Sequence, residues 1–200
     1  MKDKIQFILA SASPRRKELL QKAGYIFRIE PSNVDEETFD TAGISSDDHC
    51  KILALAKAKD VAEKFPEMPV FGSDTVVDFD GRIIGKPADA ADAERITRML
   101  FSKPHKVITG IALVWKEKSI EIVEVDITTV FPKKLTEEQI QSHIAGGLWE
   151  GKAGAYGIQE TGDAFVECIE GSFTNVMGLP MERVESLLAH FRIFPKKIAD

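Results

Sequence analysis

The chain has few cysteines and no long hydrophobic segment. Among its 200 residues are two cysteines, Cys50 and Cys168, which lie far apart and form no Cys-x-x-Cys pair. A disulfide framework and a zinc ribbon are therefore not expected. The short apolar run from Ile5 to Ala10 is too brief for a membrane span or a signal peptide. We expect a cytoplasmic protein that does not insert into a membrane.

Positive charge is also scarce. The 26 lysines and arginines are outnumbered by 32 aspartates and glutamates, which gives a net charge of −6 at pH 7. A dedicated binder of nucleic-acid polymers needs a basic face, so we expect no such partner. Hydrophobic residues form 44% of the chain, which is enough for a folded core. Since no repeat, low-complexity tract or Pro/Ser-rich linker divides the chain, we predict a single domain over residues 1–200.

Several familiar catalytic and nucleotide-binding motifs are missing as well. The segment Gly81–Pro87 has three residues between its first two glycines, where a Walker A loop has four, and Pro87 replaces the Ser or Thr that would contact magnesium. No Gly-x-Gly-x-x-Gly follows a strand, and no Gly-x-Ser-x-Gly elbow is present. The four histidines have no metal-binding spacing. These absences exclude P-loop, Rossmann and serine-hydrolase sites.

Hydrophobic periodicity and capping residues predict an α/β protein with a mixed sheet. Strands and helices interleave, and several neighbouring strands can pair as hairpins, for example across Asp80-Gly81. The predicted strands cover 5–10, 69–77, a short segment ending at 85–87, 106–115 and 119–131, with one or two more between 152 and 171. The predicted helices begin at Ser13-Pro14 and stop at Gly24, run from Ser46 to about Phe65, cover 88–101, open at the capping box Thr136–Gln139 and follow Pro180.

The first candidate site is Ser11-Ala12-Ser13-Pro14-Arg15-Arg16. Ser13 fits an N-cap and Pro14 the first helical position. Arg15 and Arg16 would then face the positive end of the helix dipole, at a cost of about 0.3–1 kcal/mol each. A polyphosphate bound by the guanidinium groups and the free backbone N–H groups would offset this cost. Ordinary surface charge is the alternative explanation.

Charge is unevenly distributed around this segment. Residues 1–30 contain seven cations and three anions, a net of +4, whereas residues 31–50 contain six anions and no cation. A metal-assisted phosphate site could use this reversal, although solvated surface charge is the commoner explanation of such a run.

The second candidate site combines Asp74 with Lys86. Asp74 interrupts the apolar strand around Val70 and Val76, where a carboxylate without a partner is costly. Lys86 would return on the hairpin partner and approach it. Asp74 beside a lysine or a divalent cation could activate water for attack on phosphorus. A turn or edge position for Asp74 is the alternative.

A third candidate is the glycine-rich segment 151–159, with 171–180 behind it. Small residues let a backbone approach a ligand closely, but tight turns require them equally. Within this segment, Gln159 could read the edge of a nucleobase through its paired donor and acceptor.

Six segments in this order resemble the Maf family of nucleoside triphosphate pyrophosphatases, which is related in fold to the inosine triphosphate pyrophosphatases. They are ILASASPRRKELL at 8–20, VDEE at 34–37, LAKAK at 55–59, GSDTVV at 72–77 with GKP at 85–87, KAGAYGIQ at 152–159 and GSFTNVMGLP at 171–180. The resemblance implies a curved mixed sheet flanked by helices, with two lobes around a cleft. It also implies hydrolysis between the α and β phosphates of a nucleotide, which yields a nucleoside monophosphate and pyrophosphate.

The resemblance further implies roles for individual residues. Asp74 corresponds to the catalytic base, assisted by the cationic Arg16 and Lys86, and Lys59 to a further phosphate-binding cation. Glu36 and Asp74 correspond to residues at a divalent metal, and Mg²⁺ or Mn²⁺ suits carboxylate and phosphate oxygens. The other substrate-binding residues implied are Ser11, Ser13, Arg15, Thr75 and Gln159.

Three positions resemble the branch of the family that acts on dTTP and UTP: Arg15, Thr75 and Gln159. The branch that acts on 7-methylguanosine triphosphate tends to carry Trp, Gln and Glu there. Two alternatives stay open, namely house-cleaning of modified pyrimidine nucleotides and a non-enzymatic, nucleotide-sensing role in cell division and septum formation. A homodimer is the family expectation.

Overall fold

A mixed seven-stranded sheet forms the centre of the structure, a computed structural model that describes residues 4–39, 43–158 and 164–196. Its strands are β1 (Phe7–Leu9), β2 (Phe27–Ile29), β3 (Val70–Phe79), β4 (Arg82–Ile84), β5 (His105–Trp115), β6 (Ile120–Pro132) and β7 (Val166–Glu170). They lie in the order β2-β1-β3-β5-β6-β7, and β4 pairs with β3 outside this series. β1 is parallel to β2 and β3, whereas the other pairs are antiparallel. The predicted α/β class with a mixed sheet is confirmed.

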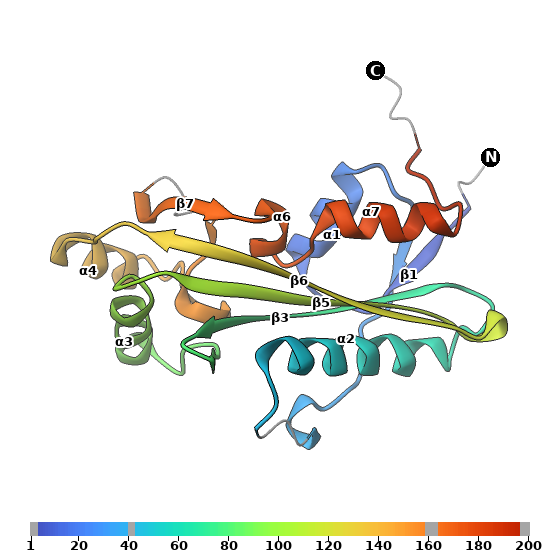
Figure 1. Cartoon of the computed structure of the whole chain (residues 1–200), viewed down its shortest axis with the longest axis horizontal. Coiled ribbons are helices and arrows are strands. Elements are labelled where there is room, and N and C mark those ends of the chain that lie inside the picture. The colour runs from blue at the N-terminus through green and yellow to red at the C-terminus, as the bar shows by residue number, and fades with distance from the viewer. Residues whose placement is uncertain (1–3, 40–42, 159–163, 197–200) are drawn as a thin grey trace.

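Helices cover both faces of the sheet (Figure 1). α2 (Ser46–Ala62) lies along one face of β3 and β5, while α1 (Pro14–Lys22), α6 (Phe173–Val176) and α7 (Met181–His190) lie on the other. α3 (Ala90–Leu100) and α4 (Glu137–Ala145) pack together at one end, and three 3-10 turns, η1 (Glu36–Thr38), η2 (Lys116–Lys118) and η3 (Ala153–Ala155), complete the fold. Within the described ranges, no helix is both long enough and apolar enough to span a bilayer.

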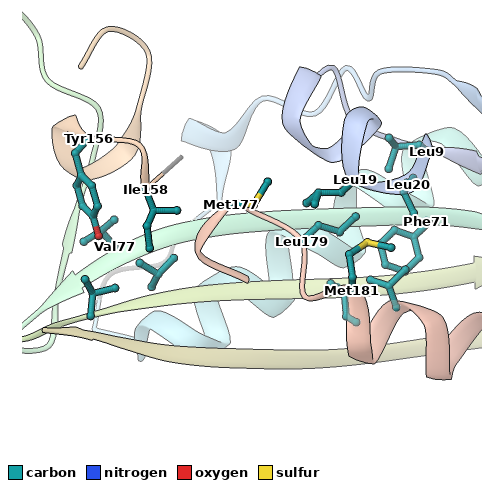
Figure 2. Packing of buried hydrophobic residues seen from close by; sticks show 14 of the residues in the cluster. Leu9, Leu19, Leu20, Phe71, Val77, Tyr156, Ile158, Met177, Leu179 and Met181 are labelled. Carbon is teal, nitrogen blue, oxygen red and sulfur yellow. The ribbon is translucent and has the colours of Figure 1, made fainter. Parts of the chain in front are cut away.

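Alternating side chains on β1 separate two apolar layers. Phe7 and Leu9 belong to the larger cluster, which reaches Phe71 and Leu179 (Figure 2). Ile8 between them faces the opposite way and packs in a second cluster with alanines and Val61 of α2. Because successive side chains of a strand point to opposite faces, three residues serve both layers. Burial of a large apolar side chain in either layer contributes roughly 1.5–3 kcal/mol.

Two glycines allow α2 to lie unusually close to the sheet. A Cβ atom at Gly72 would lie 2.3 Å from the carbonyl oxygen of Ala54, and one at Gly110 would lie 2.3 Å from that of Cys50. Such distances would force the helix away from the strands, so any larger residue is excluded at both positions. The close approach brings the side chains of α2 to the middle of β3.

One side of β3 is only partly covered by partner strands. β1 pairs with Val70 and Phe71, and β4 pairs with residues 77–79, so residues 72–76 have a partner strand, β5, on one side only. The predicted hairpin dipeptide is confirmed: Asp80 and Gly81 both have positive φ, of 55° and 76°, as a two-residue turn of this kind requires. The open stretch of β3, residues 72–76, contains Asp74.

The structure adds details that sequence patterns did not predict. β2 and α6 are three and four residues long, which is too short for a periodic signal. Ser13 occupies the N-cap position of α1 as predicted, but its hydroxyl makes no capping hydrogen bond. Instead, the backbone N–H of Ser13 donates to Oγ of Ser11 at 3.2 Å. The first turn of α1 is thus organised from the preceding loop.

Candidate active site

A cavity of about 740 Å³ lies along the open stretch of β3. Its lining includes the amino-terminal segment 10–16, part of 31–36 and a wall formed by several residues between 150 and 158. β3 contributes Asp74 and Thr75 to the cavity, and α2 contributes Lys57. Volumes of this size are typical of sites for small ligands. The family resemblance implied a cleft, and this cavity is the cleft that the described residues form.

Arg16 joins three separate segments at the base of this cavity. Its Nε donates to the carbonyl of Gly178 at 2.8 Å, and its Nη1 donates to Oγ of Ser11 at 3.1 Å and to the carbonyl of Ser73 at 2.8 Å. Its Nη2 donates to Oγ1 of Thr75 at 3.0 Å. Burial lowers the pKa of Arg16, an effect that the nearby Asp74 opposes. A guanidinium carries five N–H donors, so these four bonds leave one for a ligand.

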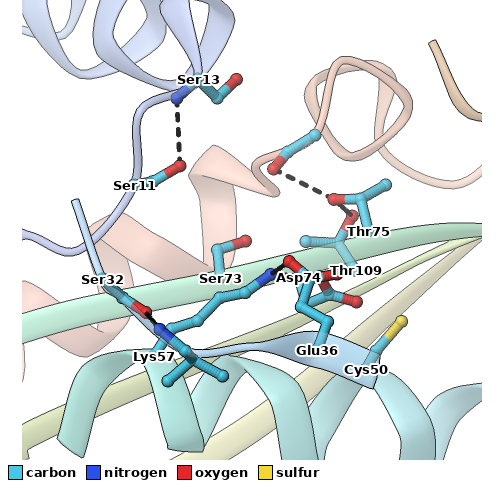
Figure 3. A network of polar contacts seen from close by, with 12 residues as sticks. Ser11, Ser13, Ser32, Glu36, Cys50, Lys57, Ser73, Asp74, Thr75 and Thr109 are labelled. Carbon is cyan, nitrogen blue, oxygen red and sulfur yellow. Dashed lines mark hydrogen bonds and ion pairs between the residues drawn. The ribbon is translucent and has the colours of Figure 1, made fainter. Parts of the chain in front are cut away.

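Lys57 lies between two carboxylates on the other side of β3 (Figure 3). Its Nζ is 2.7 Å from Oδ1 of Asp74 and 2.7 Å from Oε1 of Glu36. The side chains of Lys57 and Asp74 are only 13% and 9% exposed, whereas that of Glu36 is 56% exposed. An ion pair as buried as Lys57–Asp74 is costly to break from one side, because the remaining charge loses its partner.

Lys57 lies at the cavity, where the family resemblance had implied Lys59 as a phosphate-binding cation. Lys59 does not line the cavity, and its Nζ pairs with Glu121 on the surface at 2.8 Å. Two residues along a helix correspond to about 200° of rotation, so the two lysines face nearly opposite directions. The helical period indicates which lysine faces the sheet: Lys57 lies four residues after buried Leu53 and four before buried Val61, so all three are on one face of α2.

The other predicted site residues fall into two groups. Ser11 and Thr75 line the cavity, but their hydroxyl oxygens are already bonded to Arg16, and that of Thr75 also contacts Thr109 at 3.0 Å. Ser13, Arg15 and Lys86 line the cavity as well, and neither Arg15 nor Lys86 has an ion-pair partner in the part of the chain that the structure describes. Lys86 does not pair with Asp74.

The wall at residues 152–158 is held in a strained turn. Gly154 and the non-glycine Ala155 both have positive φ, of 74° and 60°. Nε2 of His143 lies 2.8 Å from the carbonyl of Ala155, and Nε2 of His105 lies 2.7 Å from the hydroxyl of Tyr156. Burial lowers the pKa of His105 to about 4 and raises that of Tyr156, so this pair is neutral near pH 7. The strain of Ala155 persists because these buried contacts define the turn.

Gln159, the predicted reader of the nucleobase, lies outside the described residues. Ile158, immediately before it, is buried and lines the cavity. Lys57 is the cavity cation that the sequence analysis did not single out. The buried contacts of His105 and His143 are structural and support the wall of the cavity.

The donor set near β3 fits a divalent metal that is shared with a ligand. No group of three or more His, Cys, Asp and Glu side chains suitable for a metal is found among the described residues. Asp74 and Glu36 nevertheless converge on one cation, the ammonium of Lys57. Mg²⁺ is commonly held by one or two carboxylates together with substrate phosphates. Two carboxylates facing a cavity for an anion meet that description.

This arrangement defines a class of protein: an α/β fold whose open strand edge carries cations and paired carboxylates, suited to a phosphorylated ligand. The chain belongs to the family described as Maf-like protein, whose sequence pattern matches residues 6–191. The resemblance derived from the motifs is thereby confirmed.

Several proteins of similar sequence share one name. The chain is 47% identical over 181 residues to the "dTTP/UTP pyrophosphatase" of Citrifermentans bemidjiense, which covers 90% of this chain and 93% of that protein. It is 45% identical over 188 residues to the protein of the same name from Bacillus cytotoxicus, which covers 93% of this chain and 95% of the relative. A solved HAM1 protein from Coxiella burnetii aligns over 66% of this chain and 75% of its own, with 17% identity and a TM-score of 0.42.

Proposed function

We propose that this protein is a nucleoside triphosphate pyrophosphatase that hydrolyses dTTP and UTP to the nucleoside monophosphate and pyrophosphate. Relatives that are 43–47% identical over most of the chain carry that name. The observation that carries the proposal is Asp74, a buried carboxylate that borders a cavity lined by lysine and arginine side chains. A binding protein alone would not need a carboxylate among these cations.

In the proposed reaction, Asp74 accepts a proton from water. In the free protein its Oδ1 accepts a hydrogen bond from Lys57, and Oδ2 is the oxygen to which we assign the proton. The water oxygen bonds to the α phosphorus, its proton passes to Asp74, and the bond from the α phosphorus to the bridging oxygen breaks. Pyrophosphate leaves with the electron pair of that bond. A positioned general base of this kind contributes about 10²–10⁴-fold to the rate.

The cations of the cavity bind and stabilise the phosphates. Arg15 and Lys86 have no ion-pair partner among the described residues, so their charges are available to a tetra-anionic substrate. Charge that develops on phosphate oxygens during attack is stabilised by such preorganised groups. Arg16 holds the loop, β3 and residue 178 in position and offers one remaining donor. Ser13, at the start of α1, borders the same space.

Glu36 and Asp74 would hold a divalent cation, Mg²⁺ or Mn²⁺, together with the phosphates. Bound there, such an ion would neutralise phosphate charge and polarise the phosphorus–oxygen bonds. For the base, we propose that Gln159 contacts the pyrimidine edge, because it directly follows Ile158 of the cavity wall.

A panel of nucleoside triphosphates with Mg²⁺, assayed for pyrophosphate and orthophosphate separately, tests the proposal. We expect pyrophosphate from dTTP and UTP, and a loss of kcat of at least about 100-fold in Asp74→Asn. Asp80→Asn is the matched control, because Asp80 lies in the β3–β4 turn and pairs with Lys103 away from the cavity. Orthophosphate as the product would contradict attack at the α phosphorus, and full activity of Asp74→Asn would remove Asp74 as the base.

A further inference from the structure

The ammonium of Lys57 lies where a metal shared by two carboxylates would lie. It is equidistant, at 2.7 Å, from one oxygen of Asp74 and one of Glu36 (Figure 3). The position is not accidental, because Gly72 admits the backbone of α2 so close to β3 that Lys57 reaches Asp74 with its side chain largely buried. The two carboxylates therefore already share one cation that belongs to the chain itself.

We infer that Lys57 is a built-in competitor of the divalent metal, whose ammonium must leave the carboxylate pair before a metal can bridge it. The inference rests on the proposed function, which expects a metal at Asp74 and Glu36 and a phosphorylated substrate in the cavity. It assigns Lys57 two alternating partners: the carboxylates in the free protein, and the substrate phosphates once the metal has bound.

The positions and charges of the three side chains favour this exchange. The ammonium of Lys57 already lies 2.7 Å from one oxygen of each carboxylate. A divalent cation held by the same two side chains would lie close to this positive charge, and the two would repel each other. The three side chains sum to one negative charge while Lys57 stays, and a divalent cation in its place neutralises the carboxylates completely. The released ammonium would remain beside the cavity that Lys57 lines, where the phosphates of the proposed substrate would offer negative charge.

The alternative is that Lys57 is an organiser, which keeps the carboxylates together and so assists metal binding. The two roles predict opposite effects of removing its charge. If Lys57 competes, Asp74 and Glu36 gain affinity for a metal in its absence. If it organises them, they lose affinity.

Binding of Mn²⁺ to the nucleotide-free protein, followed by the electron paramagnetic resonance signal of free Mn²⁺, separates these roles. We expect Lys57→Met to bind Mn²⁺ roughly tenfold or more tightly than wild type, since a unit charge at contact distance has been removed. Lys59→Met is the matched control, because it removes the same charge from the same helix on its outer face. Its Mn²⁺ affinity should equal that of wild type.

Two further measurements test where the ion binds and whether the variant is folded. In the double variant Lys57→Met/Asp74→Asn, the gain in Mn²⁺ affinity should disappear. Thermal unfolding with and without Mn²⁺ should show a larger stabilisation by the ion in Lys57→Met than in wild type, and Lys57→Gln serves if the methionine variant does not fold. Unchanged or weaker Mn²⁺ binding by the folded variant would overturn the inference.

This outcome is independent of the pyrophosphatase assay. Failure of the wild-type protein to release pyrophosphate from dTTP or UTP would refute the proposed function and leave the Mn²⁺ comparison standing. Conversely, an active enzyme whose Lys57→Met variant binds Mn²⁺ no better than wild type would retain its function and lose this role for Lys57.

Discussion

Adjacent arginines at the start of α1 should respond to substitution in opposite ways. Arg16 donates four of its five N–H groups to the protein, two of them to the partly buried backbone carbonyls of Ser73 and Gly178. Arg15 lines the same cavity without an ion-pair partner among the described residues. Arg16→Gln should therefore cost stability, whereas Arg15→Gln should cost substrate binding.

The size of both effects follows from the hydrogen bonds that each substitution removes. A buried carbonyl that loses its hydrogen bond costs about 1–3 kcal/mol. Because these two carbonyls are only partly buried, the free energy of unfolding should fall by about 1–3 kcal/mol in total in Arg16→Gln. A charge-assisted bond from Arg15 to a phosphate, worth about 1.5–3 kcal/mol, corresponds to an increase in KM of roughly 10–100-fold in Arg15→Gln.

Urea unfolding of both variants at pH 7, with steady-state kinetics on dTTP for each, measures these effects. The expected result is a stable Arg15→Gln protein with a raised KM and a destabilised Arg16→Gln protein. Equal stability of Arg16→Gln and wild type would show that its hydrogen bonds do not hold the three segments together. A destabilised Arg15→Gln protein with an unchanged KM would refute the division of roles.

Two further predictions concern buried titratable groups. Burial depresses the pKa of His105 from 6.5 to about 4. Between these two pH values the unfolded chain takes up a proton at His105, while the folded protein does not. The free energy of unfolding should therefore be fully retained above pH 6.5 and fall by roughly 3 kcal/mol as the pH drops to 4. Urea unfolding between pH 7 and 4.5 should show this slope in wild type and a shallower one in His105→Gln, and equal slopes would assign the acid sensitivity to other groups. Cys50 is fully buried, with its pKa raised to about 12, whereas Cys168 is exposed. A disulfide exchange reagent at pH 8 should modify one thiol of the native protein and both after unfolding, and rapid modification of both thiols in the native state would contradict the burial of Cys50.

Local features of the chain could be predicted because they depend on neighbours in sequence. The hairpin at Asp80-Gly81 follows from residues that tolerate positive φ, and the capping box at Thr136–Gln139 from two side chains three residues apart. The start of α2 at Ser46 followed in the same way from its capping residues, whereas the helix ends at Ala62, three residues before the predicted Phe65. None of these required knowledge of the sheet order.

The choice between Lys57 and Lys59 shows where such reasoning stopped. Both lie in the same motif, and their distance along the chain does not indicate which one faces Asp74. That depends on the rotation of α2 about its axis, which is set by the close contact of the helix with Gly72 and Gly110. The burial of Leu53 and Val61 indicates which face of α2 is turned inward. It identifies Lys57 as the partner of Asp74 only once the strand against which the helix packs is known.

The amino-acid sequence by itself determined the α/β class, most element boundaries and the family, and it pointed to Asp74, Lys86 and the two arginines, all of which line the cavity. These properties reside in local hydrogen bonding, in periodicity and in motifs that occupy a few consecutive residues. Only the tertiary structure decided that Arg16 bonds to a carbonyl 162 residues away, and that Lys57 sits between Asp74 and Glu36. Such contacts arise where sheet register and helix packing bring distant segments together, and no short stretch of sequence specifies either of them.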